Sequence, residues 1–151
     1  HNSSMKQLPA ITVFSYGVRG ALPKDEVAEI LSSICVSHGY GKEYTLSVHV
    51  VSESSIRRLN LESRGKDSST DVLSFPLSPN EKEFGEKCLG DIFICPAVIR
   101  SQAGEFGVTY REEYVRMLVH GTLHILGFDH DTEAKAKVMF REQELWNSSY
   151  L

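Results

Sequence analysis

The chain has 151 residues, of which 24% are charged and 41% hydrophobic, and its formal net charge is −4. This length is typical of one domain, and the composition excludes disordered and collagen-like chains. The net negative charge excludes the class of nucleic-acid-binding proteins whose whole surface is basic. Any contact with phosphates must therefore be local. We interpret residues 1–4, which precede Met5, as a tag remnant and residues 5–151 as a single domain.

The cysteine pattern and the absence of long apolar runs indicate the cellular compartment. The chain has three cysteines and no CxxC motif. No segment has the continuous apolar stretch of a signal peptide or a membrane span. We therefore expect a cytoplasmic protein with free thiols and no membrane partner.

Periodicity and capping signals predict a mixture of strands and helices. Alternating and β-branched residues predict strands over 10–16, 44–51, 71–77 and 89–95. Helical spacing predicts about five helices: from Pro23 to Gly39, a short one capped by Ser52, 96–106, one after Thr109 that ends at Gly127, and an amphipathic one over 132–147 with Val138, Leu145 and Trp146 among its apolar positions. The polar segment 78–87 predicts an exposed, mobile loop. Four strands interspersed with helices predict an α/β or α+β fold.

Three histidines near the end of the fourth predicted helix suggest a metal site. His120 and His124 are four residues apart, so both rings leave the same helix face about 6 Å apart along the axis. Gly127 can adopt the left-handed conformation that turns the chain back and brings His130 close. The helix around them is apolar almost all round and is expected to be buried, so the imidazoles need partners.

Three neutral imidazoles and one open position are the usual ligand set of a catalytic zinc ion. We therefore predict one Zn²⁺ per chain, held by His120, His124 and His130 at the end of a central helix. Asp129 or Asp131 is predicted to orient one of these histidines without contacting the ion itself.

One residue argues against the best-known enzymes with this spacing. The pattern His-x3-His-x2-Gly-x2-His matches the metzincin proteases, which carry a glutamate after the first histidine as general base. That position here is Gly121. Glycine cannot accept a proton, so peptide hydrolysis by that mechanism is disfavoured.

The segment HGTLHILGFDH at 120–130 resembles the bacterial YbeY family of rRNA maturation factors, which are described as metal-dependent endoribonucleases. The stretch NLESRGKDSSTDVLSFPL at 60–77 and the strand LGDIFIC at 89–95 also fit this family. The resemblance implies a mixed sheet surrounded by helices, a zinc ion on the three histidines and a functional arginine at Arg64. It further implies trimming of rRNA, notably at the 3′ end of the small-subunit RNA, a role in ribosome quality control, and contact with the ribosome or its proteins.

A local group of basic residues is consistent with an RNA substrate. Arg64 is predicted to be catalytic together with His120, because a guanidinium forms fork-like hydrogen bonds with phosphate oxygens. Arg57, Arg58 and Lys66 are further candidates for binding single-stranded RNA.

Several alternatives remain open at this point. A structural metal in a ribosome-assembly factor without hydrolase activity would need a fourth protein ligand, for which Cys88 and Cys95 are candidates. A metal-dependent hydrolase of small molecules would need a deep, closed pocket. The nucleophile can be a water or the ribose 2′-OH, Asp129 is one candidate for the base, and the oligomeric state is not predicted.

Overall fold

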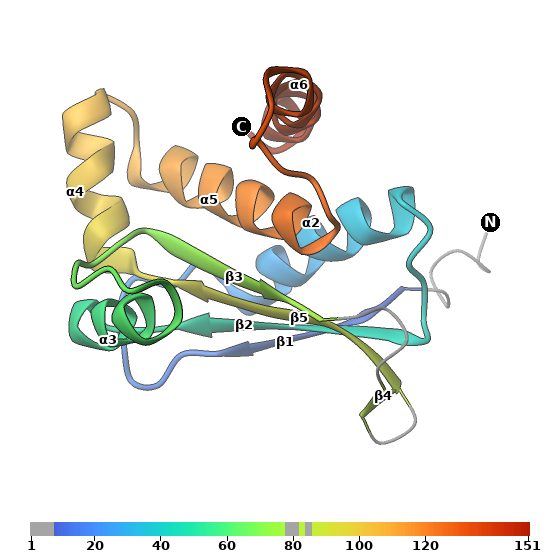
Figure 1. Cartoon of the computed structure of the whole chain (residues 1–151), viewed down its shortest axis with the longest axis horizontal. Helices are drawn as coiled ribbons and strands as arrows, with labels where there is room; N and C mark the ends of the chain where they lie inside the picture. The colour runs from blue at the N-terminus through green and yellow to red at the C-terminus, as the bar shows by residue number, and fades with distance from the viewer. Residues whose placement is uncertain (1–7, 78–81, 84–85) are drawn as a thin grey trace.

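The computed structural model describes residues 8–77, 82–83 and 86–151 as a mixed sheet with helices on both faces (Figure 1). The strands are β1 (Ala10–Phe14), β2 (Tyr44–Val50), β3 (Val72–Pro76), β4 (Lys82–Glu83) and β5 (Glu86–Ile94). Their order is β1-β2-β5-β3, with β1, β2 and β5 parallel and β3 antiparallel to β5. The two-residue strand β4 pairs only with the projecting start of β5. Apart from this short fifth strand, the predicted four-stranded mixed sheet is confirmed.

Five helices occupy the described part of the chain: α2 (Lys24–Ser37), α3 (Glu53–Arg64), α4 (Pro96–Phe106), α5 (Tyr110–Ile125) and α6 (Glu133–Tyr150). Figure 1 shows α2 and α5 on one face of the sheet, α6 beyond them, and α3 toward the other side. Side chains from β2 and β5 alternate between these faces. Leu46, Val48 and Ile92 belong to the main core between the sheet and helices α2 and α5. A smaller cluster between the sheet and α3 includes Ile56 of α3 and Leu73 of β3.

Helix α5 is the central helix, and its local signals agree with its position. Thr109 and Glu112 form the predicted capping box, in which each side chain accepts a hydrogen bond from the other residue's backbone N–H. The helix packs on β3 and β5 and is flanked by α2, α4 and α6. This coverage explains why its sequence is apolar almost all round. None of the described helices is long and apolar enough to cross a membrane.

Three predicted segments differ from the structure. The first strand ends at Phe14 because Tyr16 has a φ of 49°, which is incompatible with a continuing strand. The prediction of a loop over 78–87 was wrong where β4 pairs with the start of β5. The other residues of that segment, 78–81 and 84–85, lie outside the described residues, and so does the predicted tag remnant 1–4. Helix α6 continues to Tyr150, and its Leu145 is 63% exposed.

Candidate metal centre

The three predicted ligands meet at the C-terminal end of α5. His120 and His124 lie one turn apart on α5, and His130 follows the turn between α5 and α6. One nitrogen atom of each ring lies within 4.8 Å of the corresponding atoms of the other two. Gly127 takes a φ of 100° just after α5, and this left-handed turn lets the chain reverse and bring His130 back. The geometry agrees with the predicted histidine triad.

Gln143 on α6 holds the first of these ligands. Its Oε1 atom accepts a hydrogen bond from Nδ1 of His120 at 2.5 Å. An amide oxygen can only accept, so Nδ1 carries the proton and Nε2 keeps the lone pair that a metal needs. Sequence reasoning missed Gln143, because it lies outside the histidine motif and reaches His120 only through the packing of α6 on α5.

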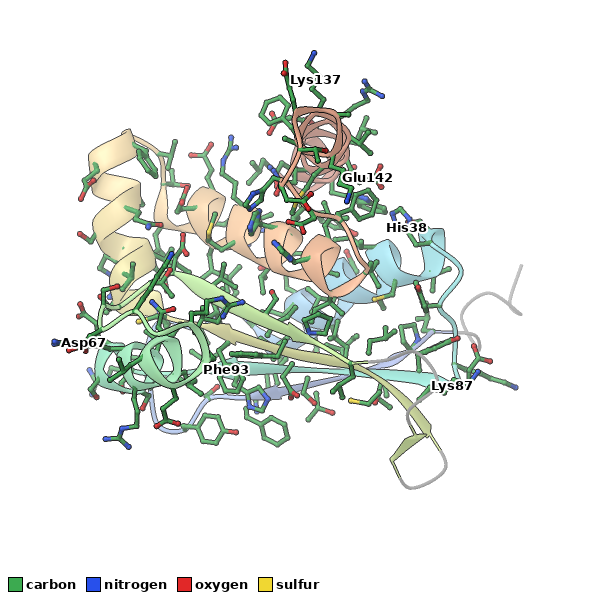
Figure 2. All side chains as sticks on the ribbon, in the orientation of Figure 1. His38, Asp67, Lys87, Phe93, Lys137 and Glu142 are labelled. Atoms are coloured by element: carbon green, nitrogen blue, oxygen red, sulfur yellow. The ribbon has the colours of Figure 1, made fainter. Side chains whose placement is uncertain are left out.

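The helix that carries Gln143 is itself anchored by the neighbouring residue. Glu142 accepts hydrogen bonds from Nε2 of His38, the C-cap residue of α2, at 2.8 Å, and from the indole N–H of Trp146, at 3.2 Å. Figure 2 shows His38 and Glu142 lying close together between α2 and α6. This contact fixes α6 over the end of α5, where Gln143 reaches His120.

The two aspartates predicted to orient a ligand have other partners. Asp129 accepts a hydrogen bond from the backbone N–H of His130 at 2.7 Å, so it shapes the loop that carries this ligand. Asp131 is exposed, and its carboxylate lies 3.5 Å from Nζ of Lys135. Among the described residues, the side chain that forms a hydrogen bond with an imidazole of the triad is therefore that of Gln143.

The electrostatic setting and the donor set both suit a divalent metal ion. Burial lowers the pKa of His124, and the adjacent His120 lowers it further. His124 therefore stays neutral at neutral pH, which is the form that binds metal. Three imidazole nitrogens fit zinc and similar ions. Across the described ranges, no cysteine or carboxylate joins the triad, so Cys88 and Cys95 do not supply the fourth ligand of a closed structural site.

Gly121, at the position of the protease glutamate, lies against the sheet. A Cβ atom at this position would lie 3.2 Å from side-chain atoms of Val72, Ser74 and Ile92. The hydroxyl of Ser74 also donates a hydrogen bond to the Gly121 carbonyl at 3.0 Å. The close approach of α5 to β3 and β5 thus depends on the missing side chain.

A cleft of about 350 Å³ lies beside the triad, between α5, β3 and the end of α3. Its lining includes His120, His124, Arg64 and Lys66, along with several hydroxyl side chains. Arg64 donates a hydrogen bond to the Ser74 carbonyl at 3.3 Å, and its guanidinium lies 5.3 Å from the centre of the Phe75 ring. The remaining N–H groups of Arg64 are free of described partners and can bind an anion in the cleft.

Asn60 fixes the turn that follows Arg64. Its buried side-chain amide donates to the carbonyl of Ser68 at 3.0 Å, and the backbone carbonyl of Asn60 accepts from the backbone N–H of Lys66 at 3.3 Å. Gly65 ends α3 with a φ of 71°, which permits the tight turn. Asn60 therefore positions both cationic side chains of the cleft. It was noted in the sequence only as part of the motif 60–77.

Residues 19–150 match the family model described as Endoribonuclease YbeY. This chain belongs to the YbeY family. Among curated relatives, Endoribonuclease YbeY of Sulfurihydrogenibium sp. is 41% identical over 135 residues, covering 87% of this chain and 84% of the relative. Endoribonuclease YbeY of Persephonella marina is 38% identical, covering 80% and 76%. A solution structure of a Thermotoga maritima protein matches with a TM-score of 0.65 at 31% identity, covering 91% of this chain and 86% of the other.

Two of the predicted RNA contacts lie outside the cleft of this YbeY-family protein. Arg57 and Arg58 line an adjoining groove on α3, and Lys66 is the candidate that lies in the cleft itself. Arg57 forms an exposed ion pair with Asp67, with Nε 2.7 Å from Oδ1. Of the predicted basic group, Arg64 and Lys66 therefore lie beside the histidines, and Arg57 and Arg58 lie in the adjoining groove.

Proposed function

We propose that this chain is a metal-dependent endoribonuclease that cuts single-stranded RNA. The observation that carries the proposal is that one cleft is lined both by two histidines of the triad and by Arg64. An arginine opposite a metal is the arrangement expected for charge stabilisation on a phosphodiester. A nucleotide of a single strand can be splayed out into a cleft of about 350 Å³, which supports a single-stranded substrate.

The histidines, Arg64 and Lys66 would have separate roles in the reaction. A divalent ion such as Zn²⁺, held by the three histidines, would supply Lewis-acid chemistry to the phosphate. Arg64, held by Ser74 and Phe75, would donate hydrogen bonds to the phosphoryl oxygens as negative charge grows on them. Lys66 would add a second positive charge at the rim of the cleft.

The same cleft and the names of the relatives support one class of substrate. The opening carries two cations, which suits a polyanion better than a neutral small molecule. The curated relatives carry the name endoribonuclease. We therefore propose rRNA as the substrate, including the 3′ end of the small-subunit RNA. The same proposal places the protein in the cytoplasm, with the ribosome or its proteins as partners and with a role in ribosome quality control.

The test is cleavage of a labelled single-stranded rRNA fragment by the zinc-loaded protein. His120→Ala and Arg64→Ala are expected to lose roughly 100-fold or more in rate, because each removes stabilisation of the transition state. Arg141→Ala is the matched control, since Arg141 is an exposed arginine on α6 away from the cleft. Equal cleavage by all four proteins would indicate a contaminating nuclease. Metal and RNA binding by wild type without cleavage would favour an assembly factor.

The chemical ends of the products distinguish the two possible nucleophiles. Attack by the ribose 2′-OH leaves a 2′,3′-cyclic phosphate, whereas attack by water does not. Mass spectrometry of the first cleavage products therefore reports which route is used, independently of the rate comparison.

A further inference from the structure

Two further hollows lie along α3, one beside the metal cleft and one beside the sheet residue Phe93. Ser68 and Ser69 line both the cleft and a neighbouring groove of about 670 Å³. Arg58 lines both that groove and a third hollow of about 400 Å³, which also contains Tyr16 and Phe93. Shared lining residues therefore make the three hollows neighbours, and we call the two outer ones the α3 track.

The first part of the α3 track carries accessible positive charge. Arg58 is exposed, and no ion pair within the described residues involves it. Arg57 is paired with Asp67, but both side chains are more than half exposed, so the pair contributes little and a phosphate can replace the carboxylate. The same groove also holds the carboxylates of Glu53 and Asp67, and Glu53 accepts a hydrogen bond from the Ser69 hydroxyl at 3.2 Å. Arg58 is therefore the cation of this groove that needs no exchange of partners to bind a phosphate.

The far end of the α3 track carries an exposed aromatic ring that is held in place. Tyr16 is 63% exposed, yet its hydroxyl lies 2.8 Å from Nδ1 of His49. Nε2 of His49 in turn lies 2.8 Å from a carboxylate oxygen of Asp91. A ring that is fixed before binding loses little freedom when a base stacks on it. Figure 2 shows Phe93, from the same hollow, on one side of α3 and Asp67 on the other.

We propose that the α3 track binds the part of the single-stranded RNA that extends beyond the metal cleft. Arg57 and Arg58 contact backbone phosphates, and Tyr16 stacks on a base. Cationic side chains for the backbone and an aromatic ring for a base are the usual means of holding a single strand without reading its sequence. This inference rests on the proposed nuclease function and adds the surface that retains the substrate.

The test measures binding of fluorescent 2′-O-methyl oligouridines, about 4 and about 12 nucleotides long, to the zinc-loaded full chain. Wild type is expected to bind the longer strand more tightly. Arg58→Ala is expected to weaken binding of the longer strand and to reduce the slope of log Kd against log salt by about 0.7, the value for one lost phosphate contact on a single strand. Tyr16→Ala is expected to weaken the same binding roughly tenfold with an unchanged slope, because stacking is not ionic.

Three further variants make the outcome specific. Tyr16→Phe keeps the ring and is expected to bind better than Tyr16→Ala. Phe106→Ala removes a ring that is also 63% exposed but lies on α4, and Arg141→Ala removes an exposed cation on α6; both are expected to match wild type. If wild type binds and cleaves RNA but the track variants also match it at every salt concentration, the inference fails and the track serves another partner. If wild type neither binds nor cleaves RNA, the proposed function fails as well.

Discussion

Nδ1 of His120 on α5 donates a hydrogen bond to the side-chain oxygen of Gln143 on α6, over 2.5 Å. This contact joins α6 to the candidate metal centre. It selects the tautomer in which Nε2 of His120 is free to bind an ion. Partners of this kind usually set both the direction and the basicity of a histidine ligand.

Replacing Gln143 by leucine should therefore weaken metal binding. Loss of such a partner typically lowers affinity about 10- to 100-fold. Competition with a chromophoric zinc chelator measures this directly and does not depend on RNA cleavage. Gln143→Glu retains an acceptor oxygen and is expected to stay close to wild type. Zinc affinity unchanged in Gln143→Leu would show that the contact does not position the ligand.

The buried imidazole of His124 should make the metal-free protein sensitive to acid. Burial, with His120 as a second cause, lowers the pKa of His124 in the fold. The unfolded chain then binds more protons, so stability is lost as the pH falls from the unfolded value of about 6.5 through the lowered folded value. Part of this loss should be absent in metal-free His124→Gln. Urea denaturation at about pH 7.5 and about pH 5.5 compares the two, and equally steep losses would contradict the assignment.

Gly121 should not tolerate the glutamate that the metzincin proteases carry. A side chain there must fit between α5 and the sheet, where Val72, Ser74 and Ile92 already lie 3.2 Å from the Cβ position. We expect Gly121→Glu to destabilise the fold by roughly 1–3 kcal/mol or more and to produce no peptidase activity. Thermal and urea denaturation measure the change.

Gly104 provides the matched control for that substitution. It also lies within a helix, but nothing stands within 4 Å of its Cβ position. Gly104→Ala should therefore stabilise the protein by up to about 1 kcal/mol through helix propensity alone. A Gly121→Glu variant as stable as wild type would mean that α5 can move away from the sheet.

A buried carboxyl group on α5 predicts a pH effect of the opposite sign. Burial raises the pKa of Glu113, and the charge of Asp71 raises it further. The folded state then holds the proton more tightly than the unfolded chain, so stability falls as the pH rises through and above the ordinary value of the group. Glu113→Gln cannot ionise, so its advantage over wild type should be largest near pH 8 and vanish near pH 4. A difference that does not change with pH would contradict this explanation.

The sequence predicted the features that depend on neighbouring residues. The capping box at Thr109, the i,i+4 pair of His120 and His124, and the turn at Gly127 are all local, and each is present in the structure. The resemblance to the YbeY family was confirmed by the match over residues 19–150. The predicted ligands therefore came from short spacings along one helix and the turn after it.

Features that depend on tertiary packing could not be predicted in this way. Gln143 meets His120 only because α6 packs on α5, and nothing in the local sequence distinguishes it from other polar residues of the helix. Tyr16 and Arg58 are 42 residues apart in the chain and meet only in one hollow beside α3. The pairing of β4 with β5 likewise depends on strand partners that polar composition does not reveal.

The most direct test of the account is the return of metal to the stripped protein. Wild type is treated with a chelator, dialysed, and titrated with Zn²⁺ while cleavage of single-stranded rRNA is followed. We expect no cleavage at first, a linear increase up to one ion per chain, and a plateau beyond it. His130→Ala, the variant that lacks the ligand outside the helix, is expected to remain inactive throughout. Full cleavage by the stripped wild type, or by His130→Ala, would contradict a histidine-held metal as the centre of the activity.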